Sequence, residues 1–169
     1  MIELVRQNYK QNKKIFNNVK KQLQKELDLS ILIDHVGSTA LKNMYGKNII
    51  DILIGAHDKE EFEYIKTVLV KLGYVPSIKS KSDIYEFFSS RVEETHSGDI
   101  HIHLAILDTE RYNDFIILID FLMNNNLEAR KYSDFKRKLI SNGIIDRKEY
   151  KNVKSEYVSK LIRKAKQTW

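Results

Sequence analysis

Two apolar runs joined by a glycine-serine turn constrain the fold of this chain more than any other stretch. The first run, ILIDHV at residues 31–36, has the length of a strand and ends at Gly37-Ser38-Thr39. The second run, NIIDILI at residues 48–54, has the pattern of another strand. Two strands joined through a turn that opens a short helix are typical of a mixed α/β domain.

The turn between the runs has the composition of a phosphate-binding site. Gly37 can adopt backbone conformations closed to other residues and lets a ligand approach closely. Ser38 or Thr39 can cap the helix that follows, whose unpaired N–H groups attract phosphate. The alternative is a plain strand-to-helix connection. Gly37, Ser38 and Thr39 are therefore candidate phosphate-binding residues.

A single acid lies inside the second apolar run. By the two-residue period of a strand, Ile50 and Ile52 share one face and Asp51 lies on the other. A charge among apolar residues is costly unless it is paired or coordinates a metal. The alternative is an Asp at a strand end, satisfied by a neighbouring Lys or a backbone N–H group. Asp51 is therefore a candidate catalytic and metal-binding residue.

The stretch DIHIHLAIL at residues 99–107 alternates cleanly between apolar and polar positions. Asp99, His101 and His103 project from one face, about 7 Å apart per step of two residues. Two imidazoles on one strand face can bind a metal, act as acid and base, or contact phosphate. The alternative is a polar strand face that meets solvent. His101 and His103 are therefore candidate catalytic and metal-binding residues.

Apolar periodicity predicts helices between and after these strands. The first covers about residues 9–27, with Ile15 and Phe16 in its buried stripe. A second begins at the cap Asp58 and ends before Gly73. The segments after it are predicted to be a strand at residues 74–76, a polar loop at 77–82 and a strand at 84–89.

The pattern from Thr109 onward is entirely helical. A break is expected at residues 124–126, and a last helix is expected from Asp146. No linker or second domain is needed, so we expect one domain over residues 1–169 with a helical part at about 110–169.

The formal net charge of +6 favours anionic partners and weak contact with nucleic acid. No RNA-binding aromatic motif or helix-turn-helix signature is evident, so a solvated basic surface is preferred over a nucleic-acid interface. We expect this surface on the outer side of the last helix. Its basic residues are Arg147, Lys148, Lys151, Lys154, Lys160, Arg163, Lys164 and Lys166.

The chain has no cysteine, which excludes disulfides and thiolate metal sites and is typical of a cytosolic protein. No N-terminal signal pattern or long apolar run occurs, so no membrane association is expected. We therefore predict a cytoplasmic location.

HVGSTA at residues 35–40, Lys47, and IIDIL at residues 49–53 resemble the GrpB family of the nucleotidyltransferase superfamily. The family pattern is roughly H-[IV]-G-S-T-A-V-P-G-L followed, a few residues later, by K-P-[IV]-I-D. This chain departs from it with LKN at residues 41–43 in place of Val-Pro-Gly, and with Asn48 in place of Pro. The loop can therefore differ in shape, while the turn and the acid are retained.

The resemblance extends over nearly the whole chain. A late H-[LI]-H strand is matched at residues 101–103, and a Y-x-x-x-K pair in the helical tail is matched by Tyr132 and Lys136. The resemblance implies an α/β (α+β), nucleotidyltransferase-like fold. Such a fold has a small, mixed, twisted sheet flanked by helices, with a helical C-terminal extension.

The resemblance also implies a nucleotide or a phosphorylated small molecule as the ligand, with Mg²⁺ or Mn²⁺ as cofactor. Lys47 precedes the Asp51 strand and is then a phosphate contact, unless it is simply an exposed loop lysine. His35 precedes the turn and either orients it or packs in the core; we favour the orienting role.

One element of the superfamily signature is missing. The strand after the turn normally carries an acid-x-acid pair, but Asp51 is followed two residues later by Leu53. One Asp with histidines suits Zn²⁺, Mn²⁺ or Fe²⁺ better than Mg²⁺, which prefers oxygen ligands. Asp99, His101 or His103 could replace a further carboxylate of the superfamily.

Three hypotheses follow. The first is a divergent nucleotidyl- or phosphoryl-transfer enzyme that uses Gly37, Ser38, Asp51 and one or both strand histidines. The second is a protein that binds a nucleotide or phosphate without catalysis. The third is a metal-dependent hydrolase or lyase that uses Asp51 and the His-x-His strand.

Overall fold

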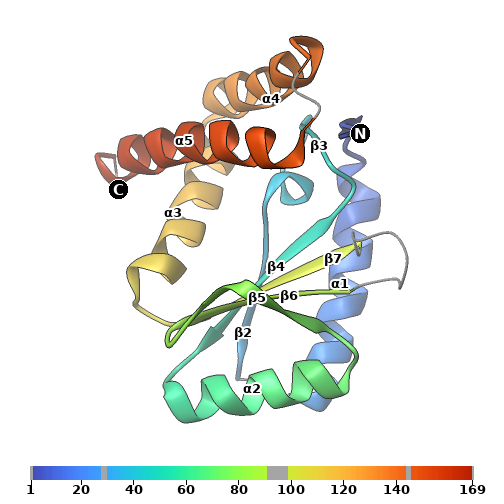
Figure 1. Cartoon of the computed structure of the whole chain (residues 1–169), viewed down its shortest axis with the longest axis vertical. Coiled ribbons are helices and arrows are strands. Elements are labelled where there is room, and N and C mark those ends of the chain that lie inside the picture. The colour runs from blue at the N-terminus through green and yellow to red at the C-terminus, as the bar shows by residue number, and fades with distance from the viewer. Residues whose placement is uncertain (1, 28–29, 91–98, 144–145, 169) are drawn as a thin grey trace.

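The structure, a computed structural model, describes residues 2–27, 30–90, 99–143 and 146–168. Over these ranges the chain forms strands and helices around one mixed sheet (Figure 1). The strands are β1 (Val5–Arg6), β2 (Leu32–Val36), β3 (Tyr45–Gly46), β4 (Ile50–Ala56), β5 (Val75–Ser82), β6 (Tyr85–Ser89) and β7 (Ile100–Ile106). The helices are α1 (Tyr9–Glu26), the short 3₁₀ helix η1 (Ser38–Ala40), α2 (Lys59–Lys71), α3 (Glu110–Asn124), α4 (Asn126–Ser141) and α5 (Arg147–Lys166).

The order of strands in the sheet brings the two predicted functional stretches together. The order is β2-β4-β7-β6-β5, with β4 and β7 parallel and the other neighbouring pairs antiparallel. In the register of β4 and β7, Asp51 lies directly beside His101. On its other side, Asp51 lies opposite Val36, the last residue before the glycine-serine turn. The sheet therefore fixes the acid between the turn and the first histidine.

Helices α1 and α2 cover one face of the sheet (Figure 1). Ile50 and Ile52, which were predicted to share a face of β4, are buried there with Ile54, against Phe16 of α1 and Phe62 of α2. Burial of a side chain of this size contributes roughly 1.5–3 kcal/mol. This face is therefore the main hydrophobic core.

Helices α3, α4 and α5 form a layer on the opposite side of the sheet (Figure 1). Tyr112 of α3 packs on the sheet residues Val36, Leu53 and Ala105. Phe121 of α3 belongs instead to a core shared by the three helices. Because α3 contacts both the sheet and the other two helices, it connects the helical layer to the sheet.

The main predictions of fold are confirmed. The mixed sheet with flanking helices and a helical C-terminal part is the α/β architecture that the sequence predicted. The break falls at Asn125, and Asp146 caps α5 through its carboxylate. Asp58 caps α2 as expected, and Gly73 follows that helix with φ +89°. Among the described residues, no helix has both the length and the apolar composition needed to cross a membrane.

Three local predictions were wrong. Residues 77–82 belong to the edge strand β5, whose polar composition follows from its solvent exposure rather than from a loop. Ile15 is 38% exposed because it lies about 100° around the helix from Phe16. The helix after the turn is the short η1, whose N-cap is Gly37 without a side-chain hydrogen bond, so neither Ser38 nor Thr39 caps it.

Candidate functional site

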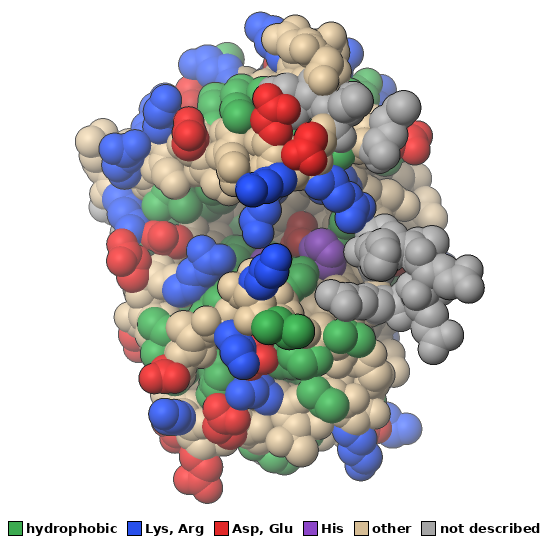
Figure 2. All heavy atoms as spheres, viewed as in Figure 1, with side chains coloured by type: hydrophobic (Ala, Val, Ile, Leu, Met, Phe, Trp, Pro, Cys, Tyr) green, Lys and Arg blue, Asp and Glu red, His purple; other side chains and the backbone are tan. Residues whose placement is uncertain are grey.

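A cleft of about 590 Å³ separates the sheet from the helical layer. One wall contains Asp51, His101 and His103 together with the Gly37-Ser38 turn. The opposite wall is built from α3, α4 and α5. Figure 2 shows a hollow on this face of the molecule, with lysine and arginine side chains above it and to its left and histidine inside it.

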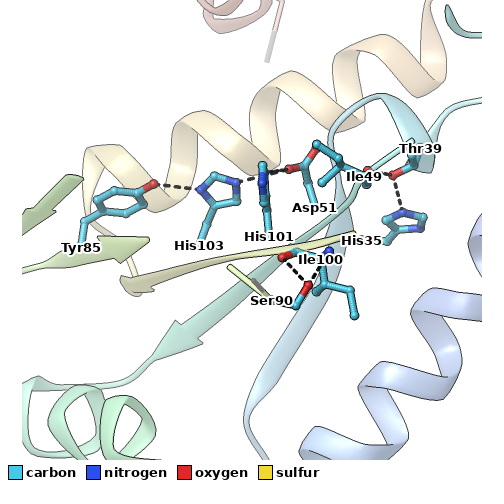
Figure 3. Close-up of polar contacts among 9 residues, drawn as sticks. All are labelled: His35, Thr39, Ile49, Asp51, Tyr85, Ser90, Ile100, His101 and His103. Carbon is cyan, nitrogen blue, oxygen red and sulfur yellow. Dashed lines mark hydrogen bonds and ion pairs between the residues drawn. The ribbon is translucent and has the colours of Figure 1, made fainter. Parts of the chain in front are cut away.

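The two strand histidines converge on one oxygen of Asp51 (Figure 3). Nδ1 of His101 lies 3.3 Å from Oδ1 of Asp51, and Nε2 of His103 lies 3.7 Å from the same oxygen. Burial alone would raise the pKa of Asp51, but the hydrogen-bonding imidazoles outweigh it and lower that pKa below its ordinary value. The carboxylate is therefore ionised at neutral pH.

Tyr85 holds His103 through the ring nitrogen that does not face Asp51. Its hydroxyl lies 2.9 Å from Nδ1 of His103. Burial raises the pKa of Tyr85 and lowers that of His103, so the phenol stays protonated and the imidazole stays neutral. The hydroxyl therefore donates to Nδ1, which leaves the Nε2–H of His103 directed at Asp51. Arg111 lies over the Tyr85 ring, with its Cζ 4.4 Å from the ring centroid.

Glycine at position 37 allows the turn to lie against the acid. Its φ is +72°, in the region that L side chains rarely adopt. A Cβ at this position would overlap Oδ2 of Asp51. Gly46 has a comparable function, because a Cβ there would overlap Oγ of Ser38. The close packing of glycine backbone on these two side chains holds the turn at the edge of the cleft.

His35 and Thr39 lie outside the lining of the cleft. The Thr39 hydroxyl donates to the carbonyl oxygen of Ile49 at 3.2 Å, so it accepts the Nε2–H of His35 at 3.0 Å. The His35 ring stacks on Phe16 of α1, with the ring centroids 4.7 Å apart. Burial lowers the pKa of His35 to about 4. This placement favours the orienting role of His35, and it favours the same role for Thr39 over the direct phosphate contact that was predicted.

Among the described residues, six basic side chains line the cleft, against two acidic ones. Of the acids, Asp51 is held by the histidines and Asp114 lies 2.7 Å from Nζ of Lys166. Burial lowers the pKa of Lys47, and repulsion from Lys154 and Arg147 lowers it further, which indicates that these three cations are close together. The basic lining residues are Lys47, Arg111, Lys136, Arg147, Lys151 and Lys154.

The prediction that the basic residues of α5 form an outer surface is therefore wrong for three of them. Arg147, Lys151 and Lys154 line the cleft, on the same helix face as Val158 and Ile162. Their i, i+4, i+7 spacing is the signal that places them on one face. A prediction from charge alone overlooks this signal, because it assigns every lysine to solvent. Arg111 and Lys136 are also lining residues that had no predicted function in the site.

The predicted metal ligands do not form a metal centre by themselves. In residues 2–27, 30–90, 99–143 and 146–168, no group of three or more His, Cys, Asp or Glu side chains is arranged to hold a metal ion. Both histidines instead direct a ring nitrogen at the Asp51 carboxylate. A single carboxylate supplies too few oxygen ligands for a Mg²⁺ site made of protein alone.

Comparison with known proteins gives one family. The model of the GrpB protein family matches residues 2–164. A UPF0157 protein of Halalkalibacterium halodurans is 29% identical over 157 residues, which cover 92% of this chain and 78% of that protein. The glutamate-rich protein GrpB of Alkalihalophilus pseudofirmus is 27% identical over 153 residues, which cover 89% of this chain and 88% of that protein.

A solved structure agrees with this assignment. The crystal structure of the conserved protein GrpB from Enterococcus faecalis has a TM-score of 0.79 to this chain, with 18% sequence identity and coverage of 99% of both chains. This likeness shows a shared fold over the full length. The family resemblance that the turn, the acid and the His-x-His strand predicted is thereby confirmed. The chain belongs to the GrpB family.

Proposed function

We propose that this protein binds a phosphorylated small molecule, specifically a nucleotide, in the cleft between the sheet and the helical layer. The excess of basic over acidic lining residues supports the proposal most directly. Cations gathered around a concave site attract anions, and lysine and arginine form strong charge-assisted hydrogen bonds with phosphate. The cleft of about 590 Å³ also lies within the usual size range of small-molecule sites.

Aromatic residues at the sheet end of the cleft favour a nucleotide over inorganic phosphate. Tyr85, Phe87 and Phe115 line this end, beside Arg111. Aromatic rings and guanidinium groups can stack on a nucleobase, whereas the lysines of α4 and α5 would contact the phosphates. The base would then lie among these rings, and the phosphates between Asp51 and the lysines of α4 and α5.

A divalent metal carried by the nucleotide remains a prediction. Asp51 is ionised, so it repels a bare phosphate and attracts a metal that arrives on the phosphates. Binding that improves with Mg²⁺ or Mn²⁺, and that loses this improvement in Asp51→Asn, would support such a metal. If the affinity for the nucleotide is equal with and without metal, the basic residues alone would account for binding. A Zn²⁺ that co-purifies would instead favour the metal-dependent hydrolase.

The test is a thermal-shift and calorimetric panel of nucleoside mono-, di- and triphosphates. A ligand at a hundred times its dissociation constant adds about 2.7 kcal/mol of stability. For a domain of this size, that raises the midpoint by roughly 5–10 °C. No shift with any phosphorylated compound would refute the proposal.

Two double variants of α5 provide the matched control. Lys151→Gln with Lys154→Gln removes two charges from the cleft, and Lys148→Gln with Lys160→Gln removes the same charge from residues that do not line it. The first pair should weaken binding at least tenfold, whereas the second should change it less than about twofold. Equal losses would indicate an effect of net charge rather than a site.

Nucleotidyl transfer is the second candidate, favoured by the ionised Asp51 held beside the Gly37 turn. Phosphoryl-group chemistry needs positioning and charge stabilisation more than covalent participation of the protein. Mass spectrometry of products formed from a bound triphosphate tests this candidate. Turnover that persists fully in Asp51→Asn would contradict it.

A further inference from the structure

Lys136 of α4 carries a buried amine that has no counter-ion within the part of the chain that the structure describes. Its side chain is 2% exposed, and its Nζ has no hydrogen-bond partner among the described residues. The face of the Tyr132 ring lies beside this amine, with its centroid 4.5 Å from Nζ. Burial of an unpaired ammonium costs several kcal/mol, and a ring face compensates only part of that cost.

The charged groups around Lys136 come from several elements. Burial, and then repulsion from Lys154 of α5, lower the pKa of Lys136 to about 7, against the attraction of Asp51 on β4. Helix α3 contributes Asp114 to the cleft, but this carboxylate is paired with Lys166. In the free protein near neutral pH, the amine is therefore close to half neutral.

We propose that a bound phosphate is the missing counter-ion of Lys136, and that the phosphate binds together with a proton taken up by this lysine. The inference rests on the proposed function, because the phosphate must first occupy the cleft that Lys136 lines. A lysine has four side-chain bonds about which it can rotate, so its Nζ can turn from the Tyr132 ring toward an anion. A dianion beside the amine favours its charged form.

Proton uptake gives the binding a definite pH dependence. Above about pH 7 the free protein must gain a proton to bind, so affinity should fall about tenfold per pH unit. The phosphates do not explain this fall, because their second pKa is about 6 and they are fully ionised at higher pH. Lys47 also has a lowered pKa and lines the cleft, so it requires its own variant.

The experiment is calorimetric titration of metal-free ATP at about pH 8 in two buffers with different enthalpies of ionisation. The dependence of the observed heat on the buffer gives the number of protons taken up. The wild type should take up close to one proton per ATP. Lys136→Met should take up none and should bind at least tenfold more weakly at pH 7. Lys136→Arg should bind without uptake, because arginine stays charged.

Lys47→Met and Lys151→Met are the matched controls within the same cleft. Both should weaken ATP binding and retain the uptake. Circular dichroism of each variant checks that it is folded. Binding without proton uptake, or uptake that survives in Lys136→Met, would overturn the inference and leave the proposed function standing. If the wild type binds ATP at no pH, the proposed function fails and the inference fails with it.

Discussion

A Cβ atom on residue 37 would overlap Oδ2 of Asp51, so the glycine and the acid fit together only because the glycine lacks a side chain. The two residues are fourteen positions apart in the sequence and are brought together by the antiparallel pairing of β2 and β4. Their contact ties the geometry of the turn to the position of the carboxylate. A change at either residue is therefore expected to disturb the other.

Gly37→Ala should destabilise the protein by more than backbone strain alone accounts for. A positive φ costs an alanine about 1 kcal/mol, and displacement of Asp51 from its histidines should add roughly 1–2 kcal/mol. Gly73→Ala is the control, because Gly73 has φ +89° and a Cβ there would meet nothing within 4 Å. Urea denaturation measures both. Equal losses of stability in Gly37→Ala and Gly73→Ala would show that Asp51 is not displaced.

His35 should make the fold sensitive to acid between about pH 6.5 and pH 4. Burial lowers its pKa to about 4 from the ordinary value near 6.5, so the unfolded chain binds more protons in this window. Stability is complete above pH 6.5 and is lost as pH falls toward 4, by roughly 2–3 kcal/mol. Urea denaturation across this range should show a smaller slope in His35→Gln.

The control for this pH dependence is His57→Gln. The side chain of His57 is 55% exposed, so its removal controls for the loss of a histidine that is not buried in the core. The pKa of His103 is also lowered by burial, so His103 should account for part of the slope of stability with pH that remains in His35→Gln. An unchanged slope in His35→Gln would contradict the assignment of acid sensitivity to this residue.

The sequence predicted the site residues on each strand but not their register. Period-two alternation placed Asp51 on one face of its strand and His101 on one face of another. Their adjacency depends on a parallel pairing of β4 with β7, across a connection that contains α2, β5 and β6. The periodicity of one strand contains no information about its partner. The family resemblance, rather than the physics of the pattern, linked the two strands in advance.

Lys136 shows why the opposite wall could not be predicted. A lysine in an amphipathic helix is normally solvated, so charge alone gives no reason to bury Lys136 when Lys131 on the same helix is exposed. Only the Y-x-x-x-K resemblance singled out Lys136, and it gave the lysine no place in the site. The difference arises from tertiary packing, because α4 faces β3 and α3. The i, i+4, i+7 spacing in α5 did contain a signal, but it required placing three cations along one wall of a cleft, where each repels the others.

Removal of the Tyr85 hydroxyl should weaken the preference of His103 for one of its two neutral tautomers. In the wild type, the hydroxyl donates to Nδ1, so nitrogen NMR shifts should show an unprotonated Nδ1 and a protonated Nε2. Tyr85→Phe leaves Nδ1 without its donor, and the loss of one hydrogen bond should cost about 1 kcal/mol. A smaller excess of the Nε2-protonated form is the expected result in the variant, because Asp51 alone then favours it. An unprotonated Nε2 in the wild type would contradict the direction of these hydrogen bonds.

Asp51→Asn should change nucleotide binding in opposite directions with and without metal. Without metal, loss of the negative charge removes repulsion of the phosphates, and affinity for ATP should rise severalfold. With Mg²⁺, the variant lacks the carboxylate that attracts the ion, so the gain from adding metal should disappear. Calorimetric titrations with and without Mg²⁺ separate these effects. If Mg²⁺ still improves the affinity for ATP in the variant, the metal binds away from Asp51.

Lys136→Met should stabilise the free protein while it weakens ligand binding. Methionine has a similar length without the charge, and replacement of a buried charge by an apolar group of similar size can stabilise a protein by roughly 1–4 kcal/mol. The folded pKa of Lys136, about 7, lies below the ordinary lysine value, so wild-type stability rises with pH above 7. The advantage of the variant should therefore be largest at about pH 6 and shrink as pH rises. Lys148→Met, on the exposed surface of α5, should change stability by less than about 0.5 kcal/mol. A Lys136→Met variant that is less stable at every pH would show that the folded protein already supplies the lysine with a partner.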